Sequence, residues 1–300
     1  AIDLFAGACG TSTGARSVGV HVVAAVNHWG EAVATHALNH PEAAHVCQDI
    51  ASVDPTSMPA HDIMLASPSC VGHTRARGGE KSHHDACRAT ADDVLRFAEA
   101  NRPRAVIVEN VPEMMRWARY RSWRMGWSDL GYRVSEQVID AADAGVPQNR
   151  RRLFVVASRT SRPIAVPQPT QRHVTARECI DLDTSHGRWS RWSEWCESTR
   201  VRCVSGRARF GEAFVAAYYG ANESGRSLDR PIGTLTTVER YAVIVGDLAR
   251  MLTLDEMVRL SSFPADYAFT GTKRDRVKML GNSVPPMLAA HVIGSVVRAL

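Results

Sequence analysis

The chain has 300 residues, of which 45% are hydrophobic and 22% charged, and its formal net charge is +5. This length suffices for one large domain, or for a large and a small one, and the composition is that of a globular protein rather than a disordered one. No run of about eighteen apolar residues occurs, so we expect no membrane span. The first residues, AIDLF, are already strand-like, so we expect no signal peptide.

Cysteine usage favours a reducing compartment. The seven cysteines are irregularly spaced and form neither a CxxC pair nor a ladder of Cys and His with zinc spacing. An odd number at irregular spacing argues against a disulfide framework. We therefore expect a cytoplasmic protein without a structural metal.

Short apolar runs alternate with polar helical stretches over the first 160 residues. Strands are expected at residues 1–5, 21–26, 61–67, 104–110, 132–140 and 152–158, and helices at 31–40 and 91–101. Such alternation is typical of parallel βαβ units whose helices cover both faces of one sheet. In these sheets ligands bind beyond the carboxyl ends of the strands, which is where the candidate functional residues fall.

The pattern of apolar and polar residues changes after Arg159. Residues 161–173 are polar and proline-rich, as linkers are, and a segment without βα rhythm follows. Residues 159–209 hold ten arginines against five acidic residues, a balance that permits a polyanionic partner. The chain from residue 285 returns to an apolar helical pattern. We expect a main α/β domain, residues 1–160 and 273–300, interrupted by a smaller basic domain, residues 161–272.

Three tryptophans recur at every third position in the basic segment. They are Trp189, Trp192 and Trp195. This spacing fits one face of a buried helix, which is the interpretation we prefer. The alternative is that they pack near a bound nucleic acid.

A glycine-rich turn, DLFAGACGTSTG, follows the first strand. Glycines there let backbone amides approach a cofactor closely, or simply permit a tight bend. Phe5 stands where an aromatic ring can stack on a purine, and Trp29, after the second strand, can stack from the other side or belong to the core. His28 occupies the position at which nucleotide sites usually carry an acid for the ribose hydroxyls. Asp49 either accepts from an adenine amino group or caps a helix.

Cys70 lies in ASPSCVGHT, on a turn past the end of an apolar strand. A structural cysteine usually stands inside an apolar run, so this position indicates a nucleophile, with a structural thiol as the alternative. Glu109 ends another apolar strand. A carboxylate there must be paired or carry a proton, unless it merely caps a helix.

Arg150 and Arg152 lie in GVPQNRRRLFVV, immediately before a strand. Alternate residues of an extended segment point the same way, so the two guanidiniums share a face. Such a pair suits a phosphate or the polar edge of a heterocycle. The alternative is a solvated sheet edge.

The order of these motifs is more specific than any one of them. The motifs are, in chain order, the glycine turn, Pro-x-Cys, Glu-Asn-Val, Gln-x-Arg-x-Arg and a C-terminal GNSVPP. In this order the sequence resembles the cytosine-C5 DNA methyltransferase family over nearly the whole chain, apart from the basic insert. The resemblance implies a Rossmann-like S-adenosylmethionine methyltransferase domain, with a mixed, mostly parallel sheet, and a smaller target-recognition domain. It implies a monomer in a prokaryotic or phage-infected cell, either a restriction–modification partner or an orphan enzyme.

The resemblance also implies a reaction and the residues that carry it. A methyl group passes from S-adenosylmethionine to C5 of a specific cytosine in double-stranded DNA. Cys70 matches the nucleophile, Glu109 the acid that holds the base, and Arg150 and Arg152 the pair that positions the flipped cytosine. The residues that match donor contacts are Phe5, Ala6, Gly7, Ala8, Gly10, His28, Trp29, Asp49, Ile50, Asn282 and Ser283. Residues 234–237, TLTT, resemble the motif that organises the recognition domain.

This chemistry explains the residue types. Cytosine C5 is a poor nucleophile, and addition of a thiolate to C6 turns the ring into an enamine-like species whose C5 can attack a methyl group. A hydroxyl would be too little ionised for this at neutral pH. Glu109 and Arg152 would meet the charge that develops on N3 and O2. In duplex DNA the base must first be rotated out of the stack.

Four positions depart from the family pattern. The family usually reads Pro-Pro-Cys-Gln, whereas Ser69 and Val71 flank the cysteine here. Cys9 stands where a further glycine is common, and His28 replaces the usual acid. No reacting group is lost. Two alternatives remain open: an RNA cytosine-C5 methyltransferase, and a catalytically weakened regulatory relative that binds DNA.

Overall fold

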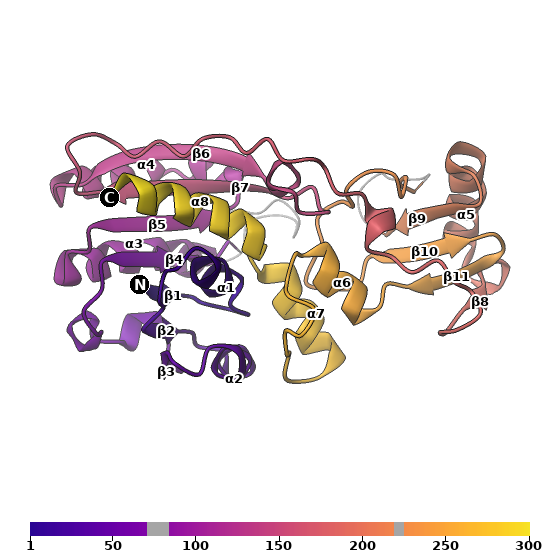
Figure 1. The fold of residues 1–300 in the computed structure, drawn as a ribbon, viewed down its shortest axis with the longest axis horizontal. Coiled ribbons are helices and arrows are strands. Elements are labelled where there is room, and N and C mark those ends of the chain that lie inside the picture. The colour runs from indigo at the N-terminus through magenta and orange to yellow at the C-terminus, as the bar shows by residue number, and fades with distance from the viewer. Residues whose placement is uncertain (71–83, 219–224) are drawn as a thin grey trace.

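The computed structural model describes residues 1–70, 84–218 and 225–300. Two lobes stand side by side in Figure 1, each built on its own sheet, with both chain termini on the larger lobe. Within these residues the larger lobe has a seven-stranded sheet and the smaller lobe a four-stranded one. Val71, which departs from the family pattern, lies outside the described residues.

The larger sheet has the strand order β3-β2-β1-β4-β5-β7-β6. Its strands are β1 (Ile2–Leu4), β2 (Ala24–Val26), β3 (Ala44–Val46), β4 (Ile63–Ala66), β5 (Ala105–Asn110), β6 (Arg133–Asp140) and β7 (Arg151–Ser158). The first five pair in parallel, and β7 runs antiparallel to both β5 and β6. The predicted mixed, mostly parallel sheet is therefore confirmed.

Helices cover both faces of this sheet, which is why its central strands are apolar throughout. The helices of this lobe are α1 (Gly10–Ser17), α2 (Gly30–Asn39), α3 (His84–Asn101), α4 (Tyr120–Asp129) and α8 (Pro286–Ala299). In β4, Met64 packs into the core under α3 and α4, whereas Leu65 packs into the core under α1 and α8. A strand buried on both faces reads as a continuous hydrophobic run.

The smaller sheet is antiparallel, with the strand order β8-β11-β10-β9. Its strands are β8 (Ser190–Arg191), β9 (Ala213–Ala217), β10 (Tyr241–Val245) and β11 (Leu248–Met251), and α5 (Glu197–Phe210) lies beside β9. The contact between helix and strand is close, because a Cβ on Gly206 would lie 2.2 Å from the Phe214 ring.

The preferred helix for the three tryptophans is wrong. Trp192 begins only a short 3-10 helix, Trp192–Glu194, directly after β8. The backbone N–H of Trp192 donates to the carbonyl of Asp247 (3.1 Å), in the turn before β11, so the segment is held beside that turn. It forms a short 3-10 turn, in which Trp195 N donates to Trp192 O (3.1 Å), rather than a long helix. The indole of Trp192 donates to Gly246 O (2.9 Å) and that of Trp195 to Ser190 Oγ (2.8 Å). The tryptophans pack within the smaller lobe.

Two helices, α6 (Leu254–Leu260) and α7 (Lys273–Asn282), lie between the lobes (Figure 1). The segment between them reaches the larger lobe, where the hydroxyl of Tyr267 donates to Ala8 O (3.0 Å). Residues 164–171 also lie against the larger lobe. Gln168 donates to Val138 O (3.0 Å), and the His291 ring lies 2.7 Å from Pro167 O.

One stretch of the described chain, Lys273–Ala299, is long and apolar enough to cross a membrane. It contains α7 and α8, and 72% of its most apolar window is buried inside the protein. A Cβ on Gly14 of α1 would lie 2.6 Å from Ala289 Cβ of α8, which shows how closely α8 packs on its neighbour. Such burial is typical of a core helix.

Candidate active site

Cys70 stands on a turn that its neighbours hold in place. The chain leaves β4 at Ala66, and the side-chain amide of Asn110, at the end of β5, donates to Pro68 O (3.0 Å). The backbone N–H of Ser69 donates to Thr90 Oγ1 (3.1 Å). Pro68 is thus held by β5, and Ser69, directly before Cys70, is held by α3.

The Cys70 thiol is half-buried among charged groups. Burial raises its pKa, and Glu109 raises it further, whereas Arg152 and, less strongly, Arg150 lower it. Glu109, Arg152 and Arg150 therefore all act on this thiol. Because the net shift is upward, the thiol is neutral in the free protein at neutral pH.

Glu109 and Arg152 form an ion pair across neighbouring strands. Arg152 Nε lies 2.9 Å from Glu109 Oε1, and the two side chains are 12% and 13% exposed. Glu109 is paired with Phe154 in the ladder between β5 and β7, so Arg152 is its diagonal neighbour. The helix-cap alternative for Glu109 is wrong, because the residue lies within β5.

Arg150 is almost completely buried, so the solvated-edge alternative is wrong for it. Its Nη1 donates to Leu235 O (3.1 Å) and its Nη2 to Gly281 O (2.7 Å). Burial lowers its pKa to about 9, with a smaller contribution from Arg152, so the group is charged at neutral pH. The guanidinium is occupied by backbone carbonyls rather than being directed at an open site.

A small cavity of about 10 Å³ links Glu109 to the start of α1. Thr11, Ser67 and Glu109 supply its polar lining, and residues of β5, β7 and α8 supply the apolar lining. The hydroxyl of Ser67 is buried and has no partner among the described residues. The cavity has about the volume that one water molecule needs.

The loop after β1 has an unusual backbone. Phe5, Gly7 and Cys9 have φ angles of 61°, 52° and 70°, in the left-handed region. Glycine enters this region freely, whereas other residues are strained there by roughly 1–3 kcal/mol. Cys9, at the position where a further glycine is common, therefore adopts a conformation that glycine would adopt at lower cost.

Two glycines of this motif serve packing. A Cβ on Gly10 would lie 1.8 Å from Val284 O, and a Cβ on Gly14 would lie 2.6 Å from Pro286 O. Both glycines therefore let the C-terminal segment approach α1. Packing against the C-terminal segment therefore explains these two glycines, without a closely approaching cofactor or a tight bend.

Other expected donor contacts come from the segments that follow β2 and β3. Trp29 is half-buried at the start of α2, and Lys278 Nζ lies 4.0 Å from the centroid of its ring. His28 is exposed. Asp49 Oδ1 accepts from Ala51 N (3.0 Å), so the capping alternative is confirmed, and its carboxylate is exposed.

The remaining expected contacts differ in exposure. Ala6, Ala8 and Ile50 are buried, and Asn282 is exposed at the end of α7. Ser283 Oγ donates to Met279 O (2.7 Å). Half-buried aromatic rings at Phe5 and Trp29, with exposed polar groups at His28, Asp49 and Asn282, fit a ligand that combines a purine with a polar chain.

Two features were missed from the sequence. One is Asn110, whose amide fixes the turn before Cys70. The other is a buried polar chain: Ser12 Oγ donates to Asp3 Oδ2 (2.6 Å) and lies 3.0 Å from His36 Nε2, and the other ring nitrogen of His36 lies 2.8 Å from His45 Nε2. An aspartate inside the apolar strand IDLF was the only signal for it.

Comparisons with known proteins identify the family. Residues 1–298 match the family model described as C-5 cytosine-specific DNA methylase. The type II methyltransferase M.HgiDI of Herpetosiphon aurantiacus is 30% identical, in an alignment 300 positions long that covers 96% of this chain and 91% of the relative. The type II methyltransferase M1.HphI of Haemophilus parahaemolyticus is 26% identical, in an alignment 329 positions long that covers 99% of this chain and 86% of the relative.

Solved structures share the fold. A prophage-encoded protein of E. coli, presented as a DNA modification methyltransferase, superimposes with a TM-score of 0.74 at 20% identity, covering 99% of this chain and 98% of that one. The S. pombe Dnmt2 methyltransferase gives a TM-score of 0.69 at 16% identity, with the same coverage.

Proposed function

From the premise that the chain belongs to the C-5 cytosine-specific DNA methylase family and methylates C5 of cytosine in DNA, we propose that Cys70, Glu109 and Arg152 act on one flipped cytosine. One observation carries this proposal. The turn that presents Cys70 is fixed by Asn110, and the thiol is within electrostatic reach of the Glu109–Arg152 ion pair.

The first step is addition of Cys70 to the ring. The thiol releases its proton to water and Sγ bonds to C6 of the cytosine. The double bond shifts from C5–C6 to C4–C5, and the electron pair of the former C4–N3 double bond moves to N3. Glu109, which has first taken a proton from solvent, gives this proton to N3. Arg152 offsets the charge at O2.

The second step restores the aromatic ring. C5 takes up the methyl group, the C4–N3 double bond re-forms, and its proton returns to Glu109. Loss of the C5 proton to a base then expels Sγ and regenerates Cys70 as a free thiolate. Cys70 then takes up a proton from solvent and Glu109 returns its proton to solvent, so both residues end as they began.

S-adenosylmethionine fits the residues around the loop after β1, and it supplies, when bound, a methyl group made electrophilic by a sulfonium. We propose that Phe5 and Trp29 flank its adenine and that Asp49 and Ile50 lie at the edge of the ring. The backbone of Ala6, Gly7, Ala8 and Gly10, together with His28, Asn282 and Ser283, would line the rest of the site. His28 would face the ribose hydroxyls.

We propose that residues 1–160 and 273–300 form the catalytic domain and residues 161–272 the target-recognition domain. The two sheets divide in this way, while residues 164–171 serve as a connector along the catalytic domain. The substrate would be double-stranded DNA, whose target base must leave the stack to reach Cys70. Every proposed catalytic group comes from one chain, so a monomer suffices. The described cysteines are free thiols, in keeping with the cytoplasm.

The test compares two cysteine variants. We expect Cys70→Ala to transfer no methyl group from labelled S-adenosylmethionine to DNA, while its affinity for DNA stays within about threefold of that of the unchanged chain. Cys179→Ala, at a half-buried cysteine of the smaller lobe, is the control and should retain activity. Duplex DNA containing 5-fluorocytosine should trap a covalent adduct with the unchanged chain and with Cys179→Ala but not with Cys70→Ala, because fluorine cannot leave as a proton. Turnover by Cys70→Ala would show that the nucleophile is wrongly assigned, and preference for RNA over DNA would show the same for the substrate.

A further inference from the structure

Arg150 connects three parts of the molecule. It precedes β7 of the larger sheet, and its two terminal nitrogens donate to the carbonyls of Leu235 and Gly281, 85 and 131 residues away in sequence. Leu235 belongs to the loop before β10 of the smaller lobe, and Gly281 to the last turn of α7. One buried guanidinium therefore joins the catalytic sheet, the smaller lobe and the segment expected to complete the donor site.

Gln148 holds the same residue, Leu235, through the backbone N–H instead of the carbonyl. Its Oε1 accepts from Leu235 N (3.1 Å), and its Nε2 donates to Leu260 O (3.2 Å) at the end of α6. Gln148 is also almost fully buried. The N–H of Leu235 is thus held by Gln148, while its carbonyl is held by Arg150.

Backbone hydrogen bonds extend this contact. Asn149 N donates to Ile232 O (2.7 Å), and Ile232 N donates to Pro147 O (3.0 Å). The two segments form a parallel bridge at Gln148 and Ile232. Residues 147–150 of the catalytic lobe therefore run beside residues 231–235 of the smaller lobe as a short ladder.

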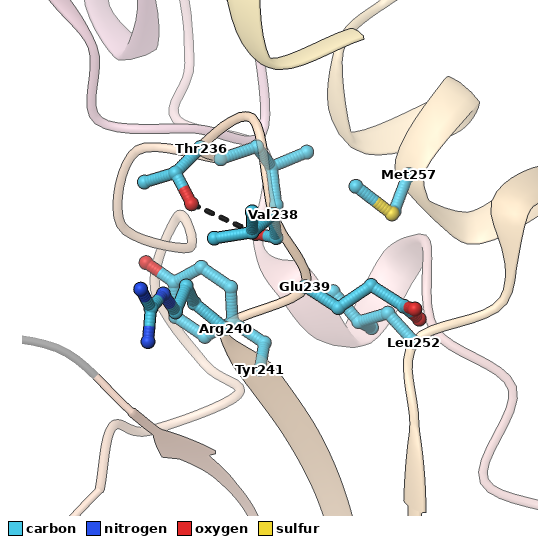
Figure 2. Close-up of a pocket in the computed structure, with 8 residues that line it drawn as sticks. Thr236, Val238, Glu239, Arg240, Tyr241, Leu252 and Met257 are labelled. Carbon is cyan, nitrogen blue, oxygen red and sulfur yellow. Dashed lines mark hydrogen bonds between the residues drawn. The ribbon is translucent and has the colours of Figure 1, made fainter. Parts of the chain in front are cut away.

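The partner loop has its own internal support. Figure 2 shows the hydroxyl of Thr236 donating to the carbonyl of Val238, a bond of 2.8 Å that folds the loop on itself before Tyr241 enters β10. Gly281 fits against this loop only because it lacks a side chain, since a Cβ there would lie 2.4 Å from Thr236 C and O.

We propose that Arg150 and Gln148 are positioning residues that hold the smaller lobe in register with Cys70, Glu109 and Arg152, and that Arg150 does not contact the target base. The inference deepens the proposed function and rests on it. To reach a base, the guanidinium would have to break two charge-assisted hydrogen bonds to buried carbonyls, each worth roughly 1.5–3 kcal/mol. Arg152, two residues further on, is already paired with Glu109 and is the guanidinium left for the ring.

The consequence concerns geometry rather than DNA affinity. Contacts to phosphates depend on surface charge and do not pass through Leu235. Seating the flipped base, however, requires the smaller lobe and the Cys70 turn to keep a fixed distance, and a displacement of about 1 Å can lower the rate by roughly a hundredfold. Loss of either residue should therefore lower kcat and leave the Kd for DNA almost unchanged.

The test is a double-mutant cycle on the whole chain, with single-turnover methylation and DNA binding measured below the Tm of every variant. Arg150→Met and Gln148→Met should each slow methyl transfer by about tenfold to a hundredfold, with the Kd for DNA within about threefold. Because both side chains hold the backbone of the same residue, Leu235, the double variant should lose no more than about threefold beyond the slower single variant. Arg151→Met, at the exposed residue between the two arginines, is the matched control and should stay within about threefold of the unchanged chain.

Arg150→Lys provides a second comparison, and it replaces Arg150→Met in the cycle if that variant fails to fold. Lysine keeps the charge and can reach one of the two carbonyls, so we expect partial recovery of kcat. Two results would overturn the positioning role. One is a fall in the methyl-transfer rate of the double variant equal to the product of the two single falls, and the other is a Kd for DNA that rises as the rate falls. Failure of the proposed function would appear differently, as turnover by Cys70→Ala, and the coupling between Arg150 and Gln148 is measured without reference to the nucleophile.

Discussion

Arg152 Nε lies 2.9 Å from Glu109 Oε1, so the guanidinium fixes the carboxyl group expected to hold the target base. The pair joins β5 to β7 beside the Cys70 turn, where removal of one partner leaves the other charge half-buried and unpaired. The two residues act on Cys70 in opposite directions, because Arg152 lowers the pKa of the thiol and Glu109 raises it. A change at either residue therefore alters both the base site and the nucleophile.

Glu109→Gln should lower kcat by roughly a hundredfold to a thousandfold, the usual loss when one group that stabilises transition-state charge is removed. Glutamine keeps the shape of the side chain but can neither take up a proton nor pass one to N3 of the ring. Single-turnover methyl transfer with saturating DNA measures the loss. Glu136→Gln, on β6 of the same sheet, is the control and should retain activity, because its partner is Arg124 rather than Arg152. A rate for Glu109→Gln within about threefold of the unchanged chain would contradict the role of Glu109.

Asp3→Asn should change how stability depends on pH. Burial raises the pKa of Asp3 to about 7, only partly opposed by the hydrogen bond from Ser12. Because the folded pKa lies above the unfolded value of 3.8, the stabilising contribution of this carboxyl is complete below pH 3.8 and is lost as the pH rises through 7. Asparagine does not titrate, so its advantage over Asp3 in the free energy of unfolding should grow by about 2 kcal/mol between pH 5 and pH 8.

Two buried histidines act in the opposite direction: His36, which lies beside Ser12 as Asp3 does, and His40, whose ring centroid lies 4.9 Å from that of His36. Burial lowers the pKa of His36 to about 3 and that of His40 to about 4, so their contribution is present above pH 6.5 and is lost as the pH falls. Comparing the variant with the unchanged chain at each pH cancels these contributions. Denaturant titrations provide the measurement, and Asp266→Asn, at an exposed carboxyl, is the control. A pH-independent difference for Asp3→Asn would mean that Asp3 titrates alike in the folded and unfolded chains.

Gly10→Ala should destabilise the chain and weaken donor binding together. The new Cβ would lie 1.8 Å from Val284 O, and overpacking of this kind costs about 3 kcal/mol. Asn282 and Ser283 directly precede Val284, so displacing this segment should also raise the Kd for S-adenosylmethionine. Gly30→Ala, where no atom lies within 4 Å of the new Cβ, should be neutral or slightly stabilising. Equal stability of the two variants would show that the C-terminal segment adapts to the methyl group.

The sequence predicts the larger sheet well, for a physical reason. Strands such as β4 are buried on both faces, so they appear as apolar runs bounded by polar turns, and Cys70 and Glu109 are visible because they interrupt that pattern at strand ends. The spacing of apolar residues and the polarity of the strand ends suffice to predict these strands, because both are local properties of the sequence.

Contacts that depend on backbone atoms far away leave no such pattern. Arg150 looks like a base-binding arginine in sequence, because nothing local shows that the carbonyls of Leu235 and Gly281 take up its donors. The spacing of Trp192 and Trp195 suits a helix equally well as a sheet edge until Asp247 accepts the backbone N–H of Trp192. Gly10 reads as a cofactor glycine although Val284 requires its missing side chain.

The arginines of residues 159–209 should contribute unequally to DNA binding. Arg207 already pairs with Glu212 (2.7 Å) and Asp247 (3.0 Å), whereas no ion pair within the described part of the chain includes Arg188 or Arg191. Each phosphate contact adds about 0.9 to the slope of log K against log salt concentration, so Arg188→Ala with Arg191→Ala should lower this slope by about 2. Arg207→Ala should leave the slope nearly unchanged, because its charge is already neutralised by carboxylates. Binding titrations over a range of salt concentrations measure both variants, and an undiminished slope for the double variant would place Arg188 and Arg191 outside the DNA contact.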